Sequence, residues 1–143
     1  MIQFELSSLI ARPLEAVSTY ILNPLNIPRW QTSMREIKPL DPGPVGLGSK
    51  FQVRNEMLGR KIEGVIEVAA FEPGQKFAMK MNSGPVKVEI TFTFKSLGDG
   101  TKLTLAVQGD TGGMFKLAEA VLANQVKGQM EQNFARLKKE LES

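Results

Sequence analysis

The chain opens on an alternation of apolar and polar residues. Between Ile2 and Ile10 the even positions are mostly apolar and the odd positions mostly polar, and this period of two predicts a β-strand with one buried face. The segment ARPLEAVSTYIL follows, with Pro13 at a plausible first helical position and apolar residues at helical spacing up to Asn23. It predicts a short helix, and LNIPRW has room for another turn or two because proline suits the start of a helix.

From residue 33 to about residue 109, apolar and polar residues again alternate, in stretches separated by turn signals that contain glycine. These signals are DPGPVGLG, LGRK, EPGQ, NSGP and LGDG. Six strands fit between them. Because the connections are short, we expect antiparallel hairpins, and the one-sided apolar face of the resulting sheet requires a cover.

Residues 112–141 are expected to supply that cover as one long helix. This segment has no proline and is rich in Ala, Leu, Lys, Glu and Gln, all of which are good helix formers. Its apolar residues follow an i, i+4 row, which drifts by about 40° per step around a helix. Either the helix bends near Gly128 or its front half faces a different surface from its back half. A bent or mobile front half would act as a gate to the space beneath it.

Histidine and cysteine are both absent from the chain. Cysteine nucleophiles, zinc sites built from cysteine or histidine, imidazole acid/base catalysis and serine-histidine triads are therefore excluded. A buried acid/base pair would place charged residues at apolar-face positions, because an unpaired buried charge is costly. The sequence shows no such pair, so it predicts no catalytic residue, and it predicts no cofactor.

Composition places the chain among single-domain globular proteins. It has 143 residues, of which 42% are hydrophobic and 23% charged, and we expect one domain over residues 1–143. Its 18 basic and 15 acidic residues are scattered, for a net charge of +3, which is not the clustered charge of nucleic-acid binders. No apolar run approaches the roughly 20 residues that span a bilayer. We expect no membrane insertion and, because the N-terminus lacks a basic leader, a cytoplasmic location.

Trp30 is the only tryptophan. An indole has a large apolar body and one polar nitrogen, so it favours the boundary between an apolar interior and a polar group. Trp30 is therefore either a core residue with its ring nitrogen bonded to a carbonyl or part of a pocket wall.

Five stretches of the chain resemble one known family. They are I..P.E.V..YI.NP.N.P.W at residues 10–30, GLGSKFQV at 46–53, VIEVAAFEPGQKF at 65–77, GDGTKLTL at 98–105 and FARLKKELE at 134–142. Together they resemble the polyketide cyclase/dehydrase branch of the START-like, Bet v 1-like (SRPBCC) superfamily, over the whole chain. The matching residues are turn glycines, helix starts and core positions, so they indicate a fold rather than an activity.

The resemblance implies the α+β helix-grip fold. In this fold a curved seven-stranded antiparallel sheet, with two short helices after its first strand, wraps around a long C-terminal helix and leaves an apolar cavity. The residues predicted to line the cavity are Trp30, Met34, Phe51, Val53, Asn55, Met57, Phe71, Met79, Met81, Phe92, Phe94, Met114, Ala118, Val121 and Leu122. Methionine suits such a site because it is flexible and polarizable.

The leading hypothesis is that the cavity binds a small hydrophobic ligand, such as a lipid or polyketide-like metabolite, for sequestration or transport. Inward or end-of-strand polar residues such as Asn55, Tyr20 and Arg54 would orient the ligand. One alternative is a cyclase-, dehydrase- or hydrolase-type enzyme acting on a hydrophobic substrate in the same cavity. A second is a protein-interaction module, such as a homodimer, with the off-phase Leu117 and Val121 at its interface.

Overall fold

The computed structural model describes residues 2–57, 59–83, 86–110 and 119–143. The predicted order of one strand, short helices, six strands and a long helix is confirmed. The elements are β1 (Ile2–Ile10), α1 (Leu14–Ile21), the 3₁₀ helix η1 (Pro24–Asn26), α2 (Ile27–Trp30), β2 (Met34–Pro39), β3 (Lys50–Met57), β4 (Arg60–Glu72), β5 (Lys76–Ser83), β6 (Val86–Leu97), β7 (Gly100–Asp110) and α3 (Glu119–Glu142).

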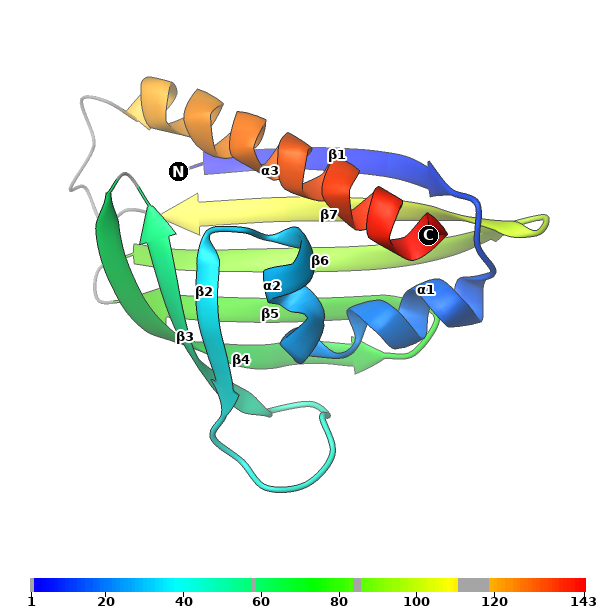
Figure 1. The fold of residues 1–143 in the computed structure, drawn as a ribbon, viewed down its shortest axis with the longest axis horizontal. Helices are drawn as coiled ribbons and strands as arrows, with labels where there is room; N and C mark the ends of the chain where they lie inside the picture. The colour runs from blue at the N-terminus through cyan, green and yellow to red at the C-terminus, as the bar shows by residue number, and fades with distance from the viewer. Residues whose placement is uncertain (1, 58, 84–85, 111–118) are drawn as a thin grey trace.

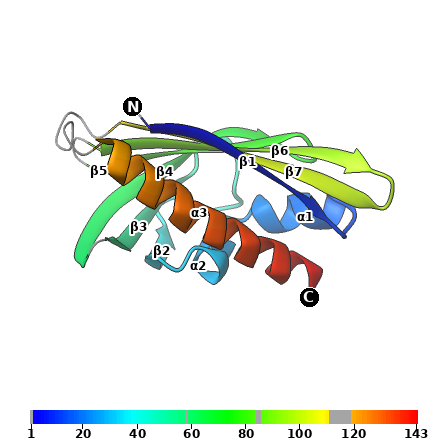
Figure 2. The same ribbon diagram turned by 90° about the horizontal axis from the view of Figure 1, so that it is seen from above.

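The strands form one seven-stranded sheet in the order β1-β7-β6-β5-β4-β3-β2. Every neighbouring pair is antiparallel. The three helical elements α1, α2 and α3 lie on the same side of the curved sheet, and α3 runs diagonally across it (Figures 1 and 2). This is the helix-grip fold that the sequence predicts, with the first and second strands at the two edges of the sheet.

Two prolines, Pro13 and Pro24, stand where helical elements begin between β1 and β2. Pro13 is the N-cap of α1 rather than its first helical residue, so the helix begins one residue later than predicted. The Pro13 carbonyl accepts a bond of 3.1 Å from the Val17 amide. Pro24 begins η1 after Asn23, whose side chain accepts from the Leu25 amide at 3.2 Å. A proline lacks the N–H that a first helical turn leaves unpaired, so each proline starts a helix at no cost in hydrogen bonds.

Two register shifts lie in the half of the sheet that ends at β2. One falls between Met34 and Glu36 in β2, and the other between Val68 and Ala70 in β4. A bulge bends its strand and increases the local twist. These shifts therefore help to curve the sheet toward the helices, and alternation patterns alone do not reveal them.

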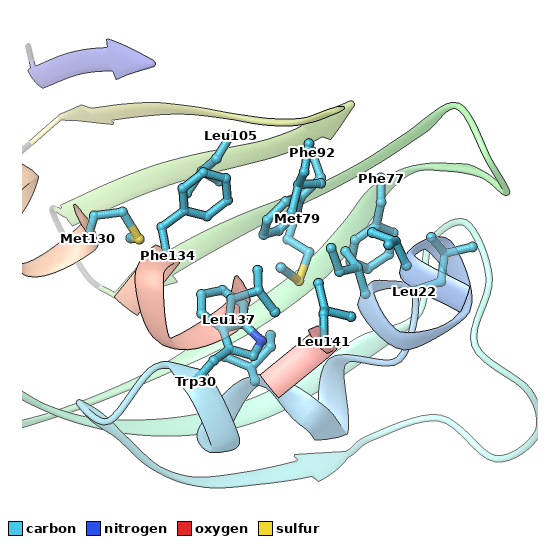
Figure 3. Close-up of a cluster of buried hydrophobic side chains, with 14 of the residues drawn as sticks. Leu22, Trp30, Phe77, Met79, Phe92, Leu105, Met130, Phe134, Leu137 and Leu141 are labelled. Carbon is cyan, nitrogen blue, oxygen red and sulfur yellow. The ribbon is translucent and has the colours of Figure 1, made fainter. Parts of the chain in front are cut away.

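The back half of α3 provides the core-facing side of the helix. Met130, Phe134, Leu137 and Leu141 are buried against the sheet and α2, whereas Val121 in the front half is 62% exposed. Figure 3 shows these four side chains converging with residues of α2 and the sheet. The helix runs through Gly128 without interruption, and its two halves have different surroundings, as one of the two predicted alternatives requires. A gating role for the front half stays a prediction.

No helix within the described ranges has both the length and the apolar character needed to cross a bilayer.

The C-terminal end of α3 is tied to the end of β1. The Glu142 carboxylate accepts a bond of 2.8 Å from the Ala11 amide and one of 3.1 Å from Lys138 Nζ, and Lys138 also donates to the Leu9 carbonyl. The bond from the Ala11 amide, followed by that from Lys138, lowers the pKa of Glu142 below its usual 4.5. This cluster fixes the last turn of α3 on the sheet edge.

We predict that Glu142→Gln lowers the free energy of unfolding at neutral pH but not in acid. Because the folded-state pKa is lowered, the charge of Glu142 stabilises the fold at pH values above 4.5, and this stabilisation disappears as pH falls through the folded-state pKa. The difference in urea midpoint between the wild type and Glu142→Gln should therefore shrink between about pH 7 and pH values below 4.5. Glu131→Gln, at an exposed α3 position, is the control. An equal deficit at every pH would contradict the electrostatic role of Glu142.

Candidate functional site

The structure brings most of the predicted cavity residues to the interior between the sheet and the helices. Those that are buried are Trp30, Met34, Phe51, Val53, Asn55, Met79, Phe92 and Phe94. Phe71 and Met81 are partly buried and pack against the same core. Met114, Ala118 and the side chains of Met57 and Leu122 lie outside the described part of the chain. Contact of any of these residues with a ligand stays a prediction.

Val121 differs from the other predicted lining residues because its side chain is largely exposed. The alternative of a protein interface involves Val121 together with Leu117, and Leu117 lies outside the described residues. Both the interface and the homodimer stay predictions.

Asn55 is the polar residue of this interior with the most unusual surroundings. It lies on β3 opposite Met34 and Ile62, and strand alternation turns its side chain to the same face as Phe51 and Val53. Asn55 is only 4% exposed. Its Nδ2 lies 3.5 Å from the sulfur of Met81, which is a weak acceptor.

The carbonyl oxygen of the Asn55 side chain has no partner within the part of the chain that the structure describes. Asn55 Oδ1 is buried and accepts no hydrogen bond from the described residues. A buried polar atom without a partner costs about 1–3 kcal/mol, and native proteins contain few of them. Asn55 therefore presents an acceptor to the interior that a hydroxyl or N–H group of a bound molecule would satisfy.

Tyr20 on α1 supplies a second polar group of this kind. Its hydroxyl oxygen is buried and has no hydrogen-bond partner among the described residues. Burial, and then the charge of Glu140, raise the pKa of Tyr20 above its usual 10.0, while Arg29 acts in the opposite direction. Tyr20 is consequently protonated at neutral pH and retains its O–H as a donor.

Two edge-to-face aromatic pairs border the same interior. Trp30 on α2 meets Phe92 on β6 with ring centroids 6.0 Å apart and an interplanar angle of 87°. Phe71 and Phe77 meet at 6.1 Å and 77°. Both geometries are favourable for aromatic rings. The first pair fixes α2 on the sheet and makes Trp30 a core residue, whereas its role as a pocket wall stays a prediction.

A groove of about 570 Å³ lies between residues 124–132 of α3 and the start of β2 and the end of β3. It is lined by Thr32, Ser33, Arg35, Glu56, Asn124, Gln125, Val126, Gly128, Gln129 and Gln132. Sequence reasoning missed this groove, because polar residues on a helix resemble an ordinary solvated face. The run NQVKGQMEQN, with five side-chain amides within ten residues, was the available signal.

The charged residues near these strands are paired on the surface. Glu36 lies 2.8 Å from Lys38 and 3.4 Å from Arg54, and the hydrogen bond from Lys38 is the main cause of the lowered pKa of Glu36. Arg54, one of the polar residues that the sequence suggests for orienting a ligand, thus forms an ion pair with Glu36. Across the described ranges, no three His, Cys, Asp or Glu residues gather in a way that would hold a metal ion. The interior offers apolar contacts and neutral hydrogen-bonding groups.

The fold and this interior define the class of protein. The sequence matches the family described as "Polyketide cyclase / dehydrase and lipid transport" over residues 1–142. The chain therefore belongs to this family, as the sequence motifs predict. Among curated protein sequences, none matches this chain.

Solved structures similar to this chain show the same fold. The crystal structure of TTHA0849 from Thermus thermophilus has a TM-score of 0.81 and 15% identity, with 97% of this chain and 96% of the other covered. Ara h 8.0201 has a TM-score of 0.72 and 18% identity, with 97% and 96% covered. The di-domain ARO/CYC BexL from the BE-7585A biosynthetic pathway has a TM-score of 0.76 and 15% identity. The match covers 97% of this chain and 46% of the BexL chain.

Proposed function

We propose that this protein binds a small, mostly apolar molecule that carries a hydroxyl group, with the apolar part on the inner face of the sheet. The observation that carries the proposal is the buried Oδ1 of Asn55, which accepts no hydrogen bond from any residue in the described ranges. A buried amide oxygen without a hydrogen bond lowers stability, so leucine at this position would be more stable. A ligand hydroxyl that donates to Asn55 Oδ1 would explain why an amide occupies the position.

Affinity and orientation would come from different parts of the site. Burial of apolar ligand surface against methionine and aromatic side chains contributes about 25 cal/mol per Å². One hydrogen bond to Asn55 would then fix the direction of the ligand, and its net contribution is about 0.5–1.5 kcal/mol. This division is the usual one in small-molecule sites, where a few polar groups orient a mainly apolar ligand.

The comparisons support a ligand of this class. The family description joins cyclase and dehydrase activity with lipid transport, and all of these involve molecules with large apolar parts. We favour binding over catalysis because, among the described residues, the buried side-chain atoms without a hydrogen-bond partner belong to Asn55 and Tyr20, which are both neutral at pH 7 and do not form an acid/base pair. Sequestration or transport is the role that such a site would serve.

A pair of aromatic probes tests the proposal. 2-Naphthol and 2-methoxynaphthalene have the same ring system, but only the first can donate a hydrogen bond. We expect isothermal titration calorimetry to show 2-naphthol binding about three- to tenfold more tightly, which corresponds to one hydrogen bond. Asn55→Leu should remove this preference while still binding both probes.

Asn82→Leu, an amide-to-leucine change at an exposed position of β5, is the matched control and should keep the preference. If neither probe binds the wild type, or if Asn55→Leu retains the full preference for 2-naphthol, the proposed function is wrong.

A further inference from the structure

The groove beside α3 differs in chemistry from the interior that it borders. Gln125, Gln129 and Gln132 follow one another at i, i+4 and i+7, so they share one side of the helix. Arg136 continues this row and closes its far end, with Nη1 3.5 Å from Thr32 Oγ1 and 3.4 Å from Asn133 Oδ1. A row of side-chain amides thus faces the start of β2 and the end of β3.

The lining of the groove is polar but electrically balanced. Its amides and hydroxyls offer both donors and acceptors. Its two charged residues, Arg35 and Glu56, pair with each other at 3.3 Å, so neither presents an uncompensated charge. Such a lining suits an uncharged ligand group that both donates and accepts hydrogen bonds, and the one further cation, Arg136 at the far end, is bonded to the neutral side chains of Thr32 and Asn133.

The groove and the buried amide occupy consecutive positions on the same strands. Glu56 of the groove follows Asn55 on β3, and the Glu56 amide donates to the Ser33 carbonyl at 2.8 Å. Met34, which stands between the groove residues Ser33 and Arg35, is the register partner of Asn55. The groove residues therefore adjoin Met34 and Asn55 along the two strands, while strand alternation turns the side chains of Asn55 and Glu56 to opposite faces.

We infer that the groove is a subsite for an uncharged, hydroxyl-rich group, such as a sugar, attached to the apolar ligand. This inference rests on the proposed function and specifies its ligand class as an amphiphile with a neutral polyol head. The volume of about 570 Å³ falls within the range of roughly 300–1,000 Å³ that is common for small-molecule sites.

Three naphthyl probes that lack the phenolic hydroxyl test the inference by calorimetry. 2-Naphthyl β-D-glucopyranoside carries a neutral polyol, 2-naphthyl sulfate carries an anion, and 2-methoxynaphthalene carries neither. We expect the glucoside to bind the wild type at least about fivefold more tightly than 2-methoxynaphthalene, as two or more added hydrogen bonds would produce. The sulfate should gain no such advantage.

The double variant Gln125→Leu/Gln132→Leu should remove the preference for the glucoside and leave the affinity for 2-methoxynaphthalene unchanged. Both side chains are exposed, so the variant is expected to fold, and circular dichroism with a thermal melt checks this. Gln108→Leu, at an exposed position of β7, is the matched control and should behave as the wild type.

The outcomes distinguish failure of the subsite from failure of the proposed function. If 2-naphthol and 2-methoxynaphthalene bind, but the glucoside binds no more tightly than 2-methoxynaphthalene, the inference is overturned and the proposed function stands. Tighter binding of the sulfate than of the glucoside also overturns the inference, as does an unchanged glucoside preference in the double variant. If none of the naphthyl probes binds, the proposed function fails and the subsite fails with it.

Discussion

Trp30→Ala should lower the free energy of unfolding by about 3–5 kcal/mol, the usual effect of removing a large aromatic side chain from a packed core. Trp30 is 3% exposed, it meets Phe92 edge-to-face, and it belongs to the short helix that lies against the back half of α3 (Figure 3). Its loss removes contacts with both layers at once. Urea unfolding followed by circular dichroism measures the effect, since the variant lacks the only tryptophan.

Leu25→Ala provides the control for this change. Leu25 lies on η1 in the same short segment but is an exposed residue, so its replacement should alter the free energy of unfolding by less than about 0.5 kcal/mol. A loss below about 1 kcal/mol in Trp30→Ala would show that Trp30 packs loosely, and it would contradict the role of α2 as a fixed wall of the interior.

Asn55→Leu should raise the free energy of unfolding by about 1–2 kcal/mol. The change keeps the approximate shape of the side chain, removes a buried oxygen that has no partner among the described residues, and gives up only a weak contact with the Met81 sulfur. A buried polar atom without a partner costs about 1–3 kcal/mol, so its replacement by an apolar group is favourable. Most core substitutions destabilise a protein, which makes this direction diagnostic.

Thr101→Val is the matched comparison and should act in the opposite direction. Thr101 is 1% exposed, but its hydroxyl donates to the Arg12 carbonyl at 2.9 Å. Removal of this bond should cost about 0.5–1.5 kcal/mol. If Asn55→Leu destabilises the protein as Thr101→Val does, the Asn55 amide is a structural group, and its assignment as a ligand anchor loses its main support.

The sequence predicts the architecture well because each element carries its own signal. The alternation from Ile2 to Ile10, the glycine turns and the proline-free terminal segment each indicate a local structure, and hairpin connections then leave few possible topologies. The whole-chain resemblance adds the arrangement in space. The bulges in β2 and β4 are not predictable in this way, because one inserted residue is too small a change in a pattern with a period of two.

The candidate site is predicted only in part, and the residues show why. Asn55 is identified because it occupies an inward position among apolar neighbours, but the absence of a partner for its oxygen depends on what stands across the interior. The amides of α3 lie on a helix face that sequence alone cannot distinguish from a solvated one. Asn133 is buried and was not predicted, because a polar residue within the apolar stripe of a helix is visible only after the helix is placed on the sheet.

Nuclear magnetic resonance of the ¹⁵N-labelled protein titrated with 2-naphthol tests ligand binding at Asn55 without any substitution. We expect a large shift of the Asn55 side-chain amide signals and nuclear Overhauser contacts between the naphthyl ring and Met79 and Phe92 on the inner face of the sheet. The exposed Asn82 amide should not shift. Contacts confined to the outer face of the sheet, or an Asn55 signal unchanged at saturation, would contradict the claim that the interior binds a ligand through Asn55.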